Sequence, residues 1–142
     1  MDKRIKIRKG KESDIPQLVK LYSGVKEIED FVGMKYDKGY FMHFIRPKSN
    51  MLFVAECDGE ICGALNAEMA EFTFLNNVVV ARAWRGKGIG GSLIKRLEQE
   101  SRRRGNRTLL ALVYDWNKPM HKIMRHYDYA RGKKTVIYSK KV

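Results

Sequence analysis

A cluster of four glycines at the start of one helix-forming segment constrains this chain more than any other feature. The glycines lie in the string Arg85-Gly86-Lys87-Gly88-Ile89-Gly90-Gly91, which follows the apolar run Val78-Val79-Val80. After them, apolar residues recur at the spacing of a single helical face: Ile89, Leu93, Ile94 and Leu97. The sequence therefore predicts a strand, a glycine-rich turn and an amphipathic helix in direct succession.

This succession suits an anionic ligand. The first amides of a helix have no intrahelical acceptor, and the helix dipole contributes about 0.3–2 kcal/mol toward binding a negative charge there. Glycines remove the Cβ atoms that would hold a phosphate away from those amides. A structural turn without a ligand is the plainer alternative, but a simple turn does not require four glycines beside Arg85 and Lys87.

Two well-known phosphate loops do not match this string. The P-loop pattern GxxxxGK[ST] does not occur in the sequence. A dinucleotide-binding fingerprint would lie early in a βαβ unit and would require an acidic residue about 20 positions later, at the end of the next strand. The glycines here lie past the middle of the chain, and the region near position 108 reads Thr108-Leu109-Leu110.

The remaining elements alternate between strands and helices. Val, Ile and Phe-rich runs and the Asp58-Gly59 turn predict strands over 4–8, 51–57, 61–68, 73–80, 108–114 and 135–139. Apolar spacing predicts helices from 14 to 23 with Ser13 as N-cap, from 89 to about 104, and from 117 to 126. Residues 26–46 indicate short helices and loops. We expect one mixed α/β domain over residues 1–142.

The number and spacing of cysteines and histidines argue against a disulfide-stabilised fold and against a metal site. Cys57 and Cys62 flank the hairpin turn, and two cysteines do not make a disulfide framework, so we expect two free thiols. The three histidines have no cysteine or carboxylate cluster at ligand spacing, so we expect no metal. No apolar run approaches the length of a membrane-spanning helix, and we expect a cytoplasmic protein without a membrane partner.

The net charge of +13 is confined to one half of the chain. Residues 1–81 carry 12 Lys and Arg side chains and 12 Asp and Glu, whereas residues 82–142 carry 17 against 4. A one-sided surplus indicates an anionic partner for the second half, although a solvated basic face is the alternative. Nucleic acid is one such partner, because Arg102-Arg103-Arg104 and nearby lysine pairs are basic, but no recognised nucleic-acid motif accompanies them.

At the glycine string the sequence resembles the GNAT superfamily of N-acetyltransferases. The cofactor motif of that family is [Q/R]-x-x-G-x-[G/A], preceded five residues earlier by an apolar strand residue. Arg85, Gly88 and Gly90 match the motif, and Val80 lies at the expected apolar position. The order of predicted elements is similar over nearly the whole chain. The resemblance implies a GNAT-like mixed sheet whose fourth and fifth strands splay apart, flanked by helices.

The resemblance also implies how acetyl-coenzyme A, the co-substrate, would bind. The amides of the glycine string, which are those of Arg85, Gly86, Lys87, Gly88, Ile89, Gly90 and Gly91, would hold the pyrophosphate. The backbone of Val78, Val79 and Val80 would meet the pantetheine arm, and Asn117 would hydrogen-bond that arm. Basic residues would lie near the 3′-phosphate: Arg82, Lys87, Lys118 and Lys122.

The expected catalytic residues do not follow the family pattern. Seven residues after Asn117, where the family places a tyrosine acid, this sequence has Met124, which cannot donate a proton. Tyr127 is the nearest substitute in sequence, and Tyr114 and His121 are others. Glu68 and Glu71, near the turn into the fourth strand, are candidates for the general base.

The resemblance thus implies an N-acetyltransferase that moves an acetyl group to a primary amine, on a small molecule or a protein, by direct attack on the thioester. Two alternatives stay open: a protein of this fold that binds acyl-coenzyme A without turnover, and a basic nucleic-acid-binding protein. A homodimer is one further arrangement that we consider.

Overall fold

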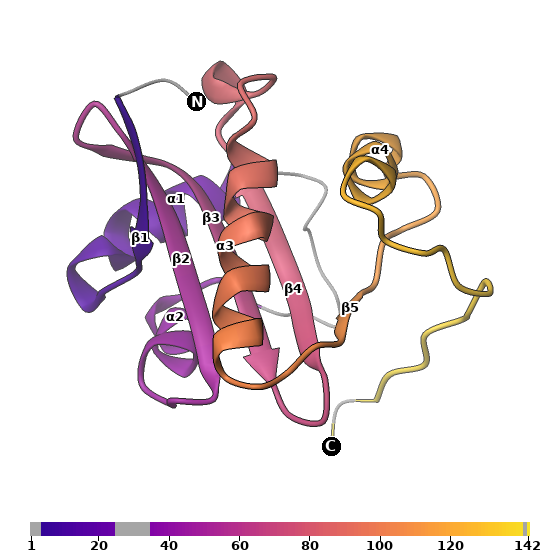
Figure 1. The fold of residues 1–142 in the computed structure, drawn as a ribbon. Helices are drawn as coiled ribbons and strands as arrows, with labels where there is room; N and C mark the ends of the chain where they lie inside the picture. Colours follow the sequence, from indigo (N-terminus) through magenta and orange to yellow (C-terminus); the bar gives the residue numbers. More distant parts are fainter. Residues whose placement is uncertain (1–3, 25–34, 141) are drawn as a thin grey trace.

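The computed structural model describes residues 4–24, 35–140 and 142 (Figure 1). Its centre is a five-stranded sheet in the order β1-β2-β3-β4-β5. The elements along the chain are β1 (Ile5–Lys9), η1 (Glu12–Asp14), α1 (Ile15–Ser23), α2 (Lys38–Ile45), β2 (Asn50–Cys57), β3 (Glu60–Met69), β4 (Thr73–Val80), η3 (Arg82–Trp84), α3 (Ile89–Arg103), β5 (Leu109–Ala111) and α4 (Lys118–His126).

The sheet is mixed, as the sequence predicts. Strands β1 to β4 form antiparallel neighbours, and β5 pairs parallel to β4. A parallel neighbour requires a crossover, and α3 supplies it. The expected strands over 51–57, 61–68 and 73–80 and the expected helices over 89–104 and 117–126 are confirmed to within about two residues, the usual scatter of such boundaries.

Helices cover both faces of the sheet: α3 lies on one face and α1 and α2 lie on the other (Figure 1). Adjacent residues of β2 therefore both face apolar layers. Phe53 packs in the core under α3, while Val54 packs under α1 and α2, and both side chains are almost fully buried. This two-sided burial explains why the middle strands are apolar without alternation.

Two expected strands differ from the structure. The strand expected over 108–114 is only β5, and its residues are exposed or half-buried instead of buried on both faces. The strand expected over 135–139 is wrong, because residues 129–140 form no helix or strand. Strands require a hydrogen-bonded neighbour, and among the described residues β5 has a strand on one side only.

The start of α1 also differs from the expectation. Ser13 lies inside η1 and does not cap α1. Instead the buried carboxylate of Asp14 accepts hydrogen bonds from both terminal nitrogens of Arg8, at 2.8 and 2.9 Å, and from the amide of Lys11 at 2.9 Å. Arg8 also donates to Glu56 at 2.8 Å. This network joins β1, β2 and the entry to α1.

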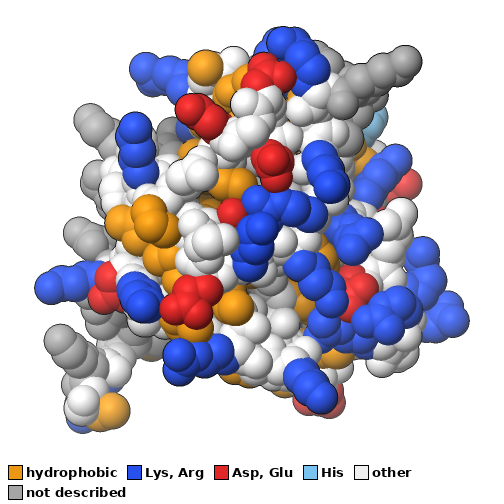
Figure 2. Space-filling model, turned by 90° about the vertical axis from the view of Figure 1, so that its left-hand side faces the viewer, with side chains coloured by type: hydrophobic (Ala, Val, Ile, Leu, Met, Phe, Trp, Pro, Cys, Tyr) orange, Lys and Arg blue, Asp and Glu red, His pale blue; other side chains and the backbone are white. Residues whose placement is uncertain are grey.

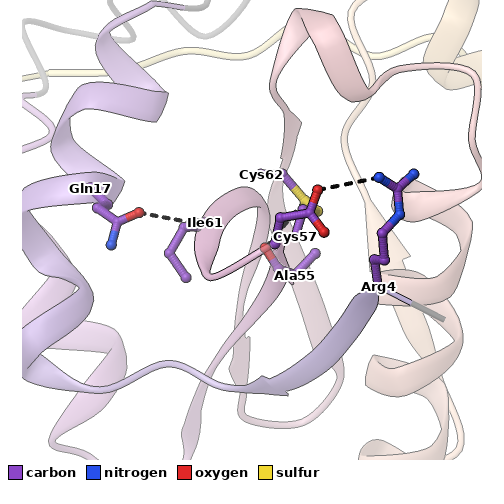
Figure 3. The surroundings of a disulfide bond; sticks show 7 residues. Arg4, Gln17, Ala55, Cys57, Ile61 and Cys62 are labelled. Carbon is purple, nitrogen blue, oxygen red and sulfur yellow. Dashed lines mark hydrogen bonds and ion pairs between the residues drawn. A yellow bond between two sulfur atoms is a disulfide. The ribbon is translucent and has the colours of Figure 1, made fainter. Parts of the chain in front are cut away.

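The expectation of two free thiols is wrong, because Cys57 and Cys62 form a disulfide (Figure 3). Asp58 and Gly59 both have positive φ, at 51° and 86°, which is the conformation of a tight hairpin turn. A bulge places Cys62 as an extra residue of β3, and the two Cα atoms lie 5.7 Å apart, within disulfide range. The pairing depends on this register, which the spacing alone did not specify.

Asp14→Asn should lower the free energy of unfolding by about 2 kcal/mol at pH 7, because it removes the charge that pairs with Arg8 in a largely buried setting. Hydrogen bonding from Arg8 holds the pKa of Asp14 below its ordinary value of 3.8. The stability that Asp14 contributes is therefore present above that value and is lost as the pH falls through the lower folded-state pKa. Urea titrations should show the wild type and the variant converging below about pH 4.

The matched control is Asp58→Asn, which breaks the exposed Arg4–Asp58 pair at 3.4 Å. An exposed pair contributes little, so this change should cost less than about 0.5 kcal/mol. Equal losses in the two variants at pH 7 would contradict the importance assigned to Asp14.

Candidate functional site

Strands β4 and β5 part after three paired residues. Thr73, Phe74 and Leu75 pair with Leu109, Leu110 and Ala111, respectively. The remaining part of β4, residues 76–80, has no neighbour on its β5 side among the described residues. In Figure 1 the chain after β5 turns away from β4 toward α4. The splayed fourth and fifth strands implied by the sequence are therefore present.

A bulge marks the point where the strands part. Asn66 of β3 pairs with Asn77 and Ala67 pairs with Leu75, so Asn76 is an extra residue in β4. The side-chain oxygen Oδ1 of Asn76 is buried and has no hydrogen-bond partner within the described parts of the chain. A buried acceptor without a partner is costly. A ligand that donates an N–H or O–H group here would remove that cost.

The glycine loop connects the open end of β4 to α3. Gly86 and Gly88 have φ of 77° and 79°, a left-handed conformation that favours glycine, and Gly88 occupies the N-cap position of α3. The amide of Ser92 makes the first hydrogen bond to the loop, at 3.0 Å from the carbonyl oxygen of Gly88. Among the described residues, the amides of Gly86 through Gly91 donate to no acceptor.

Arg85 holds the loop against the strand. Its Nε donates to the carbonyl oxygen of Val80 at 3.0 Å, so the side chain folds back over the end of β4. Ile89, the first residue of α3, is 1% exposed and anchors the other end of the loop in the core. The amides between these two anchors are thus held at a helix N-terminus, where the dipole favours an anion.

Helix α4 and the residue that follows it pack against the loop at two glycines, Gly90 and Gly91. At Gly90 a Cβ would meet Ile123 of α4 and Val78 of β4, each at 3.7 Å. At Gly91 a Cβ would overlap the hydroxyl group of Tyr127. Glycine at position 91 therefore lets Tyr127 approach the first turn of α3. One turn further along α3, Nζ of Lys95 lies 5.6 Å from the centre of the Tyr127 ring.

The structure separates the three candidate catalytic residues. Tyr127 lies against α3 beside the loop, whereas Met124 is 9% exposed and belongs to the core. Glu68 lies near the other end of β4, with its Oε1 atom 3.3 Å from Nε2 of His43. Glu71 is exposed in the turn between β3 and β4.

The residues expected to meet the cofactor come from the end of β4, the glycine loop and the start of α4. Val78 and Val80 face the core under α3, and Val79 faces the core under α1 and α2. Asn117 is the N-cap of α4, and its side-chain oxygen accepts a hydrogen bond from the Met120 amide at 3.3 Å. The basic side chains expected near the 3′-phosphate are all exposed, on η3, the loop and α4: Arg82, Lys87, Lys118 and Lys122.

Sequence reasoning missed a polar cluster beneath the parting strands. The hydroxyl group of Tyr22 donates to Oδ1 of Asn66 at 2.7 Å, and Nδ2 of Asn66 donates to the Tyr40 hydroxyl at 2.9 Å. Nδ2 of Asn77 donates to the same hydroxyl, also at 2.9 Å. Burial raises the pKa of Tyr40 to about 12, so this hydroxyl stays neutral. An asparagine inside the otherwise apolar run 61–67 was the available signal.

Within the described residues, no group of three or more His, Cys, Asp or Glu side chains could hold a metal ion. No helix in the described part of the chain is both long and apolar enough to span a membrane.

Comparison with known protein families gives one match. Residues 15–129 match the family described as acetyltransferase (GNAT) family, and this range covers the sheet from β2 to β5, the glycine loop and helices α1, α2, α3 and α4.

Solved structures of similar fold include aminoglycoside acetyltransferases. An aminoglycoside acetyltransferase from an uncultured soil metagenomic sample, in complex with trehalose, is 20% identical with a TM-score of 0.82, covering 99% of this chain and 98% of that one. Aminoglycoside N-acetyltransferase AAC(6')-Iy in complex with CoA is 16% identical with a TM-score of 0.84, covering 97% and 95%. A putative acetyltransferase from Agrobacterium tumefaciens is 16% identical with a TM-score of 0.81, covering 95% and 99%. At these identities the likeness establishes the fold.

Proposed function

Because this chain belongs to the acetyltransferase (GNAT) family, we propose that it transfers an acetyl group from acetyl-coenzyme A to a primary amine. One observation carries this proposal: the unbound amides of Gly86 through Gly91 lie at the end of a β4 segment that has no partner on its β5 side. A linear ligand with a diphosphate at one end and an amide-bearing arm at the other fits both sets of open groups.

In this proposal the diphosphate accepts hydrogen bonds from the amides of Gly86 through Gly91, which have no other acceptor among the described residues, whereas the Arg85 amide donates to the Arg82 carbonyl oxygen at 3.3 Å. The pantetheine arm runs along the open edge of Val78–Val80, and Asn117 hydrogen-bonds the arm. The basic side chains around the loop bind the 3′-phosphate. The same residues would bind coenzyme A without the acetyl group, because none of these contacts involves the thioester.

The reaction needs a neutral amine held against the thioester carbonyl. The amine nitrogen forms a bond to the carbonyl carbon, the C–S bond breaks, and the thiolate leaves with the electron pair. Glu68 accepts the proton that the nitrogen loses, with Glu71 as the alternative base. Tyr127 donates a proton to the thiolate in place of Met124, which occupies the usual acid position but has no ionisable group and is buried in the core.

The acceptor is an amine on a small molecule or a protein. Solved structures of similar fold include one with sisomicin and one with a bisubstrate analogue of CoA and an acetylated neamine, which favours the small-molecule class. The alternative activity is binding of acyl-coenzyme A without turnover. The burial of Met124 supports this alternative, because the position of the usual acid belongs to the core.

We also propose a homodimer formed through the C-terminal segment, residues 129–140. Large apolar side chains are exposed in this segment, Val136 at 75% and Tyr138 at 91%, and in the connection from β5 to α4, Leu112 and Trp116 both at 57%. Among the described residues, strand β5 forms one edge of the sheet and has no strand on its outer side. A second copy contributes its own β5 edge and its own C-terminal segment. The two copies can therefore bury each other's exposed apolar side chains.

Gly88→Ala should weaken coenzyme A binding by about tenfold or more, because a side chain strains the left-handed backbone at position 88 and shifts the loop amides from their positions. The strain should also lower the free energy of unfolding by about 1–2 kcal/mol. Isothermal titration calorimetry with coenzyme A and thermal unfolding measure the two effects.

Gly59→Ala is the matched control, because Gly59 has φ of 86° and, like Gly88, has no atom near the added Cβ. It should show a similar loss of stability and unchanged coenzyme A affinity. Wild-type protein that fails to bind coenzyme A, or two variants that bind it equally, would contradict the assignment of the loop.

Tyr127→Phe and Glu68→Gln should each lower kcat by about 10- to 100-fold, since each removes one proton-transfer group. Coenzyme A affinity should hardly change, because neither residue is assigned to its binding. Glu71→Gln separates the two candidate bases and should leave kcat within about twofold. Thiol release with acetyl-coenzyme A and panels of small amines, polyamines and peptides is the assay.

If wild-type protein binds coenzyme A and releases no thiol with any acceptor, the non-catalytic alternative replaces the enzymatic one. Loss of activity in Glu71→Gln alone would instead move the base to Glu71.

Val136→Lys combined with Tyr138→Lys should convert the dimer to a monomer, because the charges oppose burial of the segment. Light scattering after size exclusion should give twice the chain mass of 16.5 kDa for the wild type and the single mass for the variant. Ser139→Lys adds a charge without removing an apolar side chain and should stay dimeric. A wild type of single mass would exclude the dimer.

A further inference from the structure

A second hollow lies at the opposite end of α3 from the glycine loop. It has a volume of about 500 Å³, which falls in the range of small-molecule sites. Its walls come from the end of β1, the junction of α2 with β2, and the end of α3. Five cationic side chains line it: Lys9, Arg46, Lys48, Arg103 and Arg104. A smaller adjoining hollow shares Lys9 and Arg103 and adds Arg96.

Within the described part of the chain, Glu100 is the one acidic residue that lines either hollow. Its carboxylate accepts hydrogen bonds from Arg103 at 2.6 Å and from Arg104 at 2.9 Å. The hydrogen bond from Arg103 and the nearby guanidinium charges lower the pKa of Glu100 to about 2, so it is ionised at neutral pH. This single charge neutralises one of the six cations.

Helix dipoles neutralise only part of the remainder. Helices α2 and α3 both end at the hollow, and each C-terminus is equivalent to about half a negative charge. These ends account for the presence of Arg46, Arg103 and Arg104. Together with Glu100 they leave a surplus of about four positive charges.

Several of these cations have no anionic partner in the part of the chain that the structure describes. No ion pair involves the side chains of Lys9, Arg46 or Lys48 there. The Nε atom of Arg96 is buried without a hydrogen-bond partner, and its guanidinium lies 5.4 Å from the ring centre of Phe53. Like charges gathered from separate elements repel one another, and a multivalent anion would relieve that repulsion.

The hollow is separate from the loop. Helix α3 has 15 residues and therefore places about 22 Å between its two ends. Figure 1 shows the glycine loop at one end of α3 and the turn toward β5 at the other. Figure 2, which faces the β1 side of the molecule, shows Lys and Arg side chains predominating over Asp and Glu on that side.

We propose that this hollow binds a compact ligand carrying two or more phosphate groups. A concave site with cations on several sides suits a small anion with several charges. Single-stranded nucleic acid is a poorer fit, because such sites stack bases on exposed aromatic rings, and the aromatic residues here, Phe44 and Phe53, are 3% and 1% exposed. The proposal does not depend on acetyl transfer.

Calorimetry with inorganic tripolyphosphate at about 0.15 M salt tests the site. Arg46→Gln combined with Lys48→Gln should weaken binding by about tenfold or more, since it removes two unpaired cations. Lys133→Gln combined with Lys134→Gln removes the same charge at exposed positions of the C-terminal segment and should change binding by less than about twofold. Equal weakening in both double variants would mean non-specific attraction and would overturn the proposal.

Two measurements separate this hollow from the glycine loop. Gly88→Ala should retain tripolyphosphate binding in the presence of saturating coenzyme A, and the Arg46–Lys48 double variant should retain its coenzyme A response. Retained thermal stability of that double variant shows that its fold is intact. Tripolyphosphate binding that coenzyme A abolishes would assign the anion to the loop and overturn the proposal.

The choice of ligand class is tested in the same experiment. Inorganic phosphate should bind at least about tenfold more weakly than tripolyphosphate, because the hollow offers several cations at once. Equal affinity for the two anions would overturn a multivalent site. Tighter binding of a short single-stranded DNA, lost in the Arg46–Lys48 double variant, would make this a nucleic-acid surface and would also overturn the proposal.

Discussion

The parting of β4 from β5 is the constraint on which the rest of the site depends. At the paired end, the Thr73 amide donates to the Thr108 carbonyl oxygen at 2.9 Å, and the Thr73 hydroxyl lies 2.6 Å from that of Ser101. Thr73 and Ser101 are fully buried, so this end is held closed. At the other end, residues 76–80 lie beside β3 but have no strand on the β5 side among the described residues. A wedge closed at one end and open at the other exposes backbone groups in a line, and backbone groups without partners are costly unless a ligand binds them.

The glycine loop continues this line of backbone groups without hydrogen-bond partners from β4 to the start of α3. Arg85 pulls the loop onto β4, and Ile89 fixes the helix in the core. Gly91 allows Tyr127 to close over the first turn from α4. The loop is therefore supported on three sides by β4, α3 and α4. Its amides are oriented before any ligand binds, which reduces the ordering cost of binding.

Basic residues gather in the folded protein in a way that the net charge of each half of the chain does not reveal. The surplus lies in residues 82–142, and the basic residues near the loop come from that half. The hollow at the other end of α3 combines Arg103 and Arg104 with Lys9, Arg46 and Lys48, which belong to the half with no net charge. Folding thus builds a second basic region from residues that cancel out in a count along the sequence.

The sequence by itself determined the elements whose evidence is local. The glycine string, the strand Thr73–Val80 and the apolar face of α3 follow from residue spacing, because helix and strand periods and glycine backbone freedom act over a few residues. Tertiary structure alone decided the features that require partners distant in sequence. These are the Tyr22–Asn66–Tyr40–Asn77 cluster, the Cys57–Cys62 disulfide set by a bulge, and the failure of residues 135–139 to form a strand. The hydrogen bonds of a buried asparagine, the oxidation of a thiol and the pairing of a strand each depend on a neighbour across the sheet. Spacing along the chain does not specify that neighbour.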